Sequence, residues 1–423
     1  MNNRRWIISI LLLGFLSINY IDRVNLSVAT PVLMKTFNLT AGQMGSLQSV
    51  FLLAYVPLVV PMGVLADKFG ARKMNAFALF VWSLAAVLTG FATGLTMLIV
   101  LRLMLGIGES PAFPTCNKVI SDWIPVRERG LVTSIFNSGT LLGPAIGILV
   151  ASYLLNQYPW QFSFIILGSL GFIWFLLWIW LYYDPEKAWW LKKDERNYIL
   201  EHRGIVNQEA SADSSKNKMT VGMLLKQKTM WGLLLSHGGT TYAMYFFLTW
   251  IPAYLMTERN LNLVHAGWFG ALPYIVAMIV TIALSKFSDY LGRKQNLSTG
   301  GRRKMVIAYM LLGSIILLVP YVQSFLLMEL LLIISNSFFM AANTLNFALL
   351  NDMTVDKKAA GATTGLMVLG GSGSAFFAPL VTGFIIQFTG SYTSAFILSG
   401  ALLVAASAVS WFMVRKPLSP DIA

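Results

Sequence analysis

The charged side chains inside apolar segments are the residues of this sequence whose types could do chemistry. Most Lys, Arg, Asp and Glu residues lie in short polar segments, but Asp22 and Arg23 interrupt one apolar run and Arg102 and Glu109 interrupt another. An ionised side chain at bilayer depth costs roughly 2.5 to 3.5 kcal/mol even on lenient scales, so it is found mainly where it lines a cavity or a proton relay. These four residues are therefore the first candidates for a functional site.

The spacing of the four residues indicates which of them can face one ligand. Asp22 and Arg23 project onto adjacent stripes of a helix. Arg102 and Glu109 are separated by nearly two helical turns, about 10.5 Å of rise, so they share one face. Gly106 lies between them on that face and leaves it bare. A small molecule or a neighbouring helix could occupy this space.

Two of the four charges can be lost and two cannot. An arginine stays protonated at any accessible pH and needs a counter-anion. Asp22 and Glu109 could supply it, or a bound carboxylate could supply it through bidentate contact. Burial favours the neutral form of an acid and a nearby arginine favours the ionised form, so protonation could follow substrate binding. The pattern indicates an anion site coupled to protons. The alternative is static ion pairs between helices, which stabilise less well than apolar packing.

The composition places these charges in a polytopic membrane protein. The chain has 423 residues, of which 56% are hydrophobic and 12% charged, against roughly 25% charged in soluble domains. The net charge of +13 is spread over short segments, so we expect no nucleic-acid partner. Cys116 is the only cysteine. The sequence contains no metal-ligand cluster, catalytic serine elbow or phosphate loop, so we expect no metal, no cofactor and no enzyme.

Windows of about 20 predominantly apolar residues predict transmembrane helices. Lys and Arg gather in the even-numbered connections, for example Lys187–Lys228 and Lys357–Lys358, which predicts that both termini are cytoplasmic. The first run imitates a signal peptide, but its removal would leave an odd number of spans. The fold class predicted is therefore all-α integral membrane, with twelve spans at 6–28, 44–66, 74–93, 96–120, 131–155, 161–183, 229–255, 265–288, 304–322, 325–350, 360–387 and 391–414.

A repeated loop divides the chain into two halves. Gly63–Lys73 follows the second predicted helix, and the similar segment Ser285–Lys294 follows the eighth. The predicted domains are a six-helix bundle at 1–183, a cytoplasmic connector at 184–228 and a second six-helix bundle at 229–423. In the connector we expect a short helix over Leu191–Arg203 and a polar linker over Ser211–Lys218, which would tolerate movement of the halves.

Several of these motifs resemble those of a known family. Gly63–Lys73 resembles the loop signature of the major facilitator superfamily, and Asp289–Lys294 is similar to its second copy. Other motifs resemble the anion:cation symporter family, which includes bacterial sugar-acid transporters of the galactonate and glucarate type and the vesicular glutamate transporters. These motifs are Asn19–Leu26, Arg102–Pro114, Trp123–Gly130 and Phe246–Leu255.

The resemblance implies roles for individual residues in this sequence. Arg23 and Arg102 would bind the substrate carboxylate, and Asp22 and Glu109 would carry the coupling protons. The remaining roles fall to two hydroxyl donors in the cavity, Tyr20 and Tyr55, and to cytoplasmic gate residues, Asp67, Arg72 and Asp289.

The second half departs from the galactonate-type pattern. His237 stands where those transporters carry a glutamine, Asn346 where they carry a tryptophan and Val368 where they carry an asparagine. The apolar Val368 argues against a heavily hydroxylated substrate, because hydroxyl groups in a dry site need partners. His237, Asn343 and Asn346 are further candidates for substrate binding, although a membrane histidine satisfied by a neighbour is an equal alternative for His237.

Together these features predict a proton-coupled symporter that imports a small organic carboxylate by alternating access. Short loops and tails favour a bacterial inner membrane, where we expect a monomer with the lipid bilayer and the substrate as its partners. Sodium is not excluded as coupling ion. The glycine pattern from Gly130 to Gly147 nearly matches an antiporter motif, which leaves organic-anion export as the alternative, although small residues four apart also let helices pack closely. A non-transporting sensor would need an output element that the predicted loops hardly provide.

Overall fold

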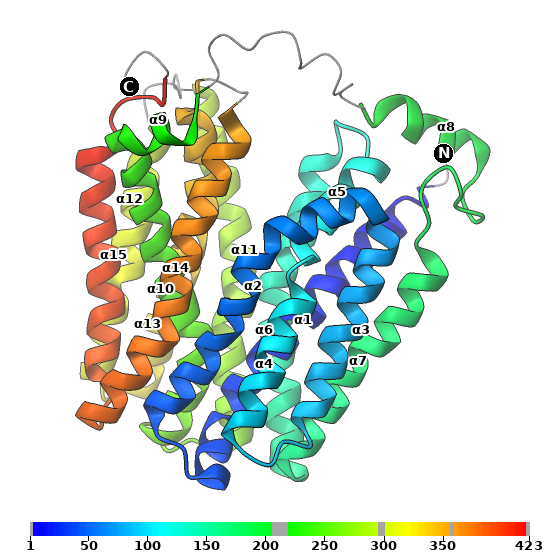
Figure 1. Cartoon of the computed structure of the whole chain (residues 1–423). Helices are drawn as coiled ribbons and strands as arrows, with labels where there is room; N and C mark the ends of the chain where they lie inside the picture. The colour runs from blue at the N-terminus through cyan, green and yellow to red at the C-terminus, as the bar shows by residue number, and fades with distance from the viewer. Residues whose placement is uncertain (1–2, 205–218, 295–300, 356–358, 420–423) are drawn as a thin grey trace. The chain divides into compact units, whose positions relative to one another are not determined.

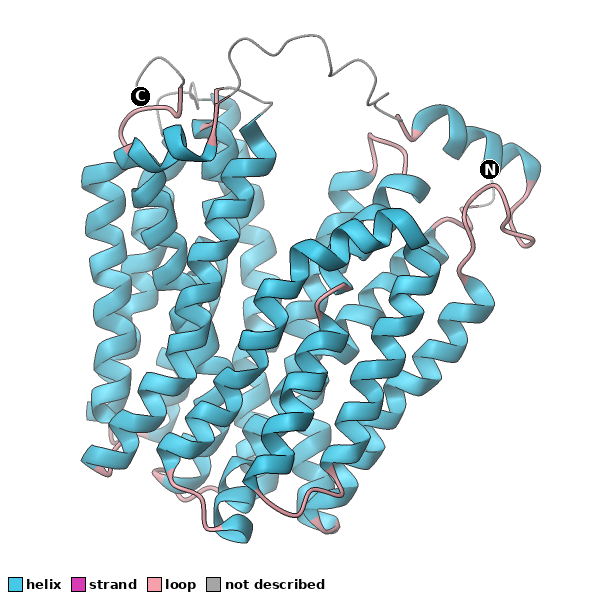
Figure 2. Cartoon of the chain, viewed as in Figure 1, coloured by secondary structure: helices cyan, strands magenta, loops and turns pink. Residues whose placement is uncertain are grey.

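The computed structural model describes residues 3–204, 219–294, 301–355 and 359–419. Figure 2 shows helices and loops, and no strand, in these ranges. The linker predicted at Ser211–Lys218 and the pair Lys357–Lys358 lie outside the described residues. The helices are α1 (Trp6–Phe37), α2 (Ala41–Phe69), α3 (Ala71–Thr89), α4 (Leu95–Glu109), α5 (Ala112–Trp123), α6 (Arg129–Gln157), α7 (Trp160–Leu181), α8 (Lys193–His202), α9 (Val221–Lys226), α10 (Lys228–Thr257), α11 (Leu263–Lys294), α12 (Gly301–Gly313), the 3-10 helix η3 (Ser314–Tyr321), α13 (Phe325–Met353), α14 (Ala360–Thr389) and α15 (Thr393–Met413) (Figure 1).

The long helices have the dimensions of membrane spans, which confirms the predicted fold class. Within the described ranges, 11 segments are long and apolar enough to cross a bilayer. α10 has 30 residues and corresponds to the remaining predicted span, and its polar residues around His237 lower its hydropathy. The fourth predicted span is divided into α4 and α5 at Pro111, which lacks the N–H needed to continue the helical hydrogen-bond ladder.

Residue contacts divide the chain into two compact units. Unit 1 comprises Met1–Leu39, Val50–Ala210 and Leu261–Trp268, and unit 2 comprises Thr40–Ser49, Ser211–Asn260 and Phe269–Ala423. Each unit has its own aromatic core. In unit 1 the ring of Phe15 meets the ring of Trp82 edge-on, with 4.8 Å between centroids. In unit 2 Phe247 packs in the same way against Tyr274 at 5.7 Å and against Phe339 at 5.8 Å.

The glycines of α6 allow α1 to approach closely. A methyl group on Gly139 would lie 3.0 Å from the Leu16 side chain, and one on Gly147 would lie 2.6 Å from the Val24 side chain. A methyl group on Gly143 would lie 2.5 Å from the carbonyl oxygen of Ser17. The antiporter-like glycine pattern is thus accounted for by helix packing, as small residues at four-residue spacing permit.

Replacing Gly143 with alanine should therefore destabilise unit 1. The new methyl group would meet the backbone of α1, which cannot move as a flexible side chain can, and overpacking of this kind costs about 1–3 kcal/mol. Thermal unfolding of the purified protein measures the effect. Gly130→Ala is the matched control, because nothing lies within 4 Å of a methyl group there and alanine is the better helix former. Equal melting temperatures for the two variants would contradict the packing role of Gly143.

The first part of the predicted connector packs onto unit 1. α8 lies beside the N-terminal end of α1 (Figure 1), and its Glu195 accepts a hydrogen bond from the Arg5 guanidinium at 3.1 Å. Arg5 also donates to both carboxylate oxygens of Glu128 at 2.8 and 2.9 Å. These bonds, with that to Glu128 foremost, raise the pKa of Arg5 above its ordinary value. Glu195 is 1% exposed, so this segment is an integral part of unit 1 rather than a free tether.

Candidate substrate and proton site

Arg23 of α1 and Glu109 of α4 form a buried ion pair. Both Nε and Nη2 of Arg23 lie 2.7 Å from Oε2 of Glu109. Glu109 is fully buried. The Arg23 guanidinium also lies against three aromatic rings, at 4.8 Å from the Tyr20 centroid, 4.6 Å from Phe51 and 5.1 Å from Tyr55. Rings at such distances attract a cation through their negative faces. The charge of Arg23 is therefore compensated from within unit 1.

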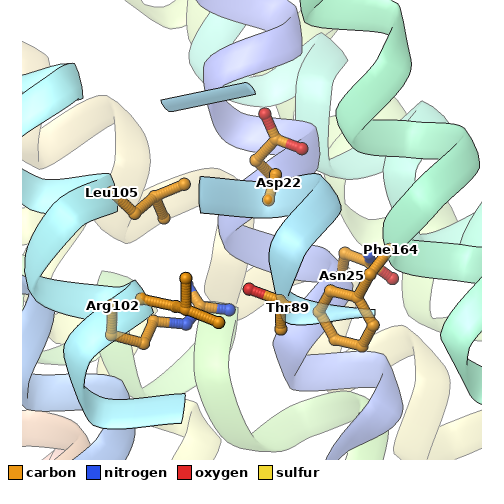
Figure 3. Close-up of a pocket in the computed structure, with 8 residues that line it drawn as sticks. Asp22, Asn25, Thr89, Arg102, Leu105 and Phe164 are labelled. Atoms are coloured by element: carbon orange, nitrogen blue, oxygen red, sulfur yellow. The ribbon is translucent and has the colours of Figure 1, made fainter. Parts of the chain in front are cut away.

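Arg102 and Asp22 line a small cavity but do not form an ion pair. The cavity lies among α1, α3, α4 and α7 and is shown in Figure 3. Arg102 forms no ion pair among the residues that the structure describes. Both carboxylate oxygens of Asp22 are buried without a hydrogen-bond partner in the same residues. Its lining residues are Asp22, Asn25, Ala86, Thr89, Leu101, Arg102, Leu105 and Phe164.

The quartet predicted from the sequence is thus assembled in one unit but is not symmetrical. The static alternative describes Arg23 and Glu109 well, because these two groups neutralise one another. The static alternative does not describe Arg102, which is buried and forms no ion pair with a carboxylate among the described residues. An unpaired buried charge is costly, so an external anion at Arg102 would relieve a cost that the protein otherwise bears.

The size of the cavity limits what it holds in this conformation. Its volume is about 10 Å³, which is roughly enough for one water molecule. A carboxylate the size of a sugar acid needs far more room. A molecule of that size could lie beside Arg102 only if side chains around this cavity, such as Leu105 and Phe164, moved.

The candidates of the second half gather on two helices of unit 2. Asn343 of α13 donates to Thr240 and Thr241 of α10 at 3.1 and 3.3 Å. Asn346 accepts a hydrogen bond from Ser236 at 2.9 Å. The hydroxyl groups of α10 were not among the predicted site residues, although their position within one turn of His237 was a usable signal.

The ring of His237 on α10 is buried against α13 and α14. It meets the ring of Phe347 edge-on at 4.8 Å between centroids. Its Nδ1 atom has no hydrogen-bond partner among the described residues. The alternative predicted that a neighbouring group would hydrogen-bond this histidine, and no described residue does so at Nδ1. Unit 2 thus contains an imidazole with an unused polar atom close to Asn343 and Asn346.

The predicted gate residues each find a separate partner. Asp67 pairs with Lys118 of α5 at 2.8 Å. Arg72 donates to the carbonyl oxygen of Ile179 at 2.7 Å, and its guanidinium lies 3.9 Å from the centroid of the Tyr183 ring. Asp67 and Arg72 therefore do not pair with each other.

In the second copy of the loop, Asp289 pairs with Arg302 of α12 at 3.1 Å, and Arg302 also lies 3.1 Å from Asp352 of α13. Arg302 and Asp352 were not predicted. Their pairing could have been suspected from the sequence, because Asp352 follows the end of one apolar run and Arg302 precedes the start of another.

These features define a polytopic helical membrane protein in which a buried arginine, Arg102, lines a cavity. Comparison with known proteins gives the family. The family model of the Major Facilitator Superfamily matches residues 12–301 and 297–423, and the chain belongs to this superfamily of membrane transporters.

Its relatives include proteins named for the transport of acids. A “Probable sulfoacetate transporter” of Cupriavidus necator is 32% identical over 96% of this chain and 93% of its own length. A “Probable L-galactonate transporter” of Escherichia coli is 31% identical, with 97% and 90% covered. A “Probable galactarate/D-glucarate transporter” of Bacillus subtilis is 29% identical, with 98% and 92% covered. The resemblance to sugar-acid transporters predicted from the motifs is confirmed by these relatives.

The fold matches that of a solved transporter structure. The structure of a bacterial homologue of the human lysosomal transporter Spinster superposes with a TM-score of 0.75 at 17% sequence identity, covering 99% of each chain. An identity this low supports the fold alone.

Proposed function

We propose that this protein is a proton-coupled symporter that imports a small organic carboxylate. The observation that carries the proposal is Arg102, a buried arginine without an anion partner among the described residues, which shares a cavity with the unpartnered carboxyl group of Asp22. A planar guanidinium offers a carboxylate two parallel hydrogen bonds. The relatives named for galactarate, glucarate, galactonate and sulfoacetate support an acid as substrate, because all of these molecules carry a carboxylate.

The proposed cycle couples the anion to protons through the two acids. Protonation of Asp22 removes the one negative charge that lines the cavity with Arg102, so the positive potential there rises and the anion binds. Protonation of Glu109 would release Arg23 for the same ligand. After the site opens to the cytoplasm, loss of the protons restores the carboxylates and helps to expel the anion. By linkage, bound substrate must raise proton affinity by the same factor by which protons raise substrate affinity.

The surroundings of the site divide the remaining roles. Tyr20 and Tyr55, which lie against Arg23, are proposed as hydroxyl donors to the substrate, and the polar cluster around His237 is proposed as its contact in unit 2. Asp67, Arg72 and Asp289 are proposed as parts of a gate on the cytoplasmic side. We further propose a bacterial inner membrane location with cytoplasmic termini, and a monomer as the working unit.

Uptake into proteoliposomes tests the proposal. The purified protein is reconstituted and offered sugar acids, dicarboxylates, sulfoacetate and aromatic acids with an imposed pH gradient, acidic outside. We expect accumulation of at least one acid, abolished by a protonophore and unchanged when sodium is replaced by potassium. Uptake indifferent to the pH gradient would remove proton coupling. Accumulation only under the opposite gradient would favour organic-anion export. The glycine pattern that suggested export is already accounted for by the packing of α6 against α1.

A further inference from the structure

Glu329 of α13 is a buried carboxyl group that the proposed cycle does not use. It lies in the second turn of the helix and is 3% exposed. Both of its carboxylate oxygens lack a hydrogen-bond partner in the described part of the chain. A buried carboxylate without a counter-ion or donor costs several kcal/mol. A neutral, protonated carboxyl group would avoid this cost.

No charged group in the described ranges compensates Glu329 from the helices packed around it. On α10, Tyr254 lies beside the residue that precedes Glu329: its hydroxyl contacts the Met328 sulfur and accepts a hydrogen bond from Arg259 at 2.7 Å. Arg259 itself donates to the carbonyl oxygens of Val319 and Val322 at the end of η3. Glu258 accepts a hydrogen bond from the backbone of Tyr392. These groups are thus engaged elsewhere.

Within the described residues of unit 2, the other neighbouring helices add no charge near Glu329. α11 contributes the phenol of Tyr274, and its charged Lys286 and Asp289 lie toward the end at which Asp289 pairs with Arg302. The titratable residue of η3 is the exposed Tyr321, and α14 carries none in Ala360–Thr389. The basic residues of α12 lie at the opposite end of α13, where Arg302 pairs with Asp352, roughly 34 Å along the helix from Glu329.

A polar stripe runs from Glu329 along α13. Asn336 and Asn343 follow at intervals of seven residues, which places all three on one face of the helix at steps of about 10.5 Å. Asn336 is fully buried, donates to the carbonyl oxygen of Pro273 at 3.0 Å and keeps an unpartnered Oδ1 atom among the described residues. Asn343 donates a hydrogen bond to Thr240 of α10 and so belongs to the polar cluster around His237. The stripe thus leads from Glu329 to the candidate substrate contacts of unit 2.

We propose that Glu329 is a second proton-binding site, located in unit 2, which takes up and releases one proton during each transport cycle. The step is protonation of a carboxylate to a carboxylic acid, and no other bond changes. The distribution of Lys and Arg assigns this end of α13 to the outer side, from which the driving proton would come. The role of Glu329 in coupling rests on the proposed proton-driven import. Its protonation is proposed from its burial and does not depend on that function.

Infrared difference spectroscopy of the protein in lipid nanodiscs tests the site without substrate. Wild-type protein titrated from acid to alkaline pH should lose a carbonyl-stretch band of a protonated carboxyl group that is absent from Glu329→Gln. Glu258→Gln is the matched control, since this exposed acid lies at the same end of unit 2 and should keep the band. Identical spectra for wild type and Glu329→Gln would overturn the proposal. If the glutamine variant does not fold, Glu329→Asp replaces it and should shift the frequency of the band. An unshifted band would show that it comes from another group and would overturn the proposal.

Proton movement during uptake tests the coupling role. Reconstituted Glu329→Gln should move one proton fewer per substrate molecule than wild type. An unchanged ratio, together with loss of the infrared band, would show a proton site without a role in coupling and would overturn that part of the proposal. Wild-type uptake without any proton movement would instead overturn the proposed symport, while the infrared result on Glu329 would still stand.

Discussion

Replacing Arg102 with glutamine should weaken substrate binding by about 100-fold, because loss of one partner of a buried, hydrogen-bonded charge pair costs about 3 kcal/mol. The measurement is the dissociation constant of the acid identified by the uptake panel, determined by calorimetry in detergent. Arg102→Lys should bind with intermediate affinity, since an ammonium group keeps the charge but not the planar fork. An unaltered affinity in the lysine variant would contradict bidentate binding.

The same substitution makes an opposite prediction for stability. Arg102 forms no ion pair among the described residues, so glutamine removes a buried charge that has no contact anion, and the melting temperature of the free protein should stay constant or rise. Arg415→Gln, an exposed arginine after α15, serves as the control and should change neither affinity nor stability. A variant that loses binding and stability together would show that Arg102 supports the fold rather than the substrate.

Replacing Glu109 with glutamine should abolish uptake driven by a pH gradient while substrate exchange across the membrane continues. An amide cannot bind and release the coupling proton, but it leaves the cavity at Arg102 intact. The structure adds a stability cost, because Arg23 loses the anion that its Nε and Nη2 atoms contact at 2.7 Å. Breaking a buried pair in this way costs about 3–5 kcal/mol. Gradient-driven uptake, counterflow exchange and thermal unfolding are the measurements.

Two further variants separate the roles of the ion pair. Asp22→Asn removes a carboxyl group without hydrogen-bond partners in the described ranges, so it should impair gradient-driven uptake without the loss of stability seen for Glu109→Gln. The double variant Arg23→Gln, Glu109→Gln removes both charges and should recover most of the stability but not the transport. Glu109→Gln protein with normal stability and normal gradient-driven uptake would refute both the coupling role and the pairing.

Local patterns were sufficient to predict much of this protein. The apolar windows predicted its long helices, because the requirement to span a bilayer is met by length and hydrophobicity alone. The charges at Asp22, Arg23, Arg102 and Glu109 stood out for the same reason. The glycines of α6 predicted a close helix contact, and the motifs around Arg102 and Trp123 predicted the family.

Other features depended on neighbours that are distant in the sequence. Glu195 reads as a surface residue of a charged connector, yet it is buried against Arg5. Glu329 stands near a helix end, where a charge usually reaches water, yet it is enclosed by other helices. Burial of an individual side chain depends on what packs over it, and that is not encoded in the local pattern of hydrophobicity.

The sequence by itself determined that two acids and two arginines lie within the membrane, since composition and spacing along a helix are local properties. Only the tertiary structure decided how they pair. The fold of unit 1 brings Arg23 of α1 to Glu109 of α4, whereas Arg102 and Asp22 line a cavity without forming an ion pair. The physical reason is geometric: an ion pair forms only where two side chains from different helices can reach one another, and helix packing sets that reach. Arg102, the arginine left without an ion-pair partner among the described residues, is the one that we propose binds the substrate.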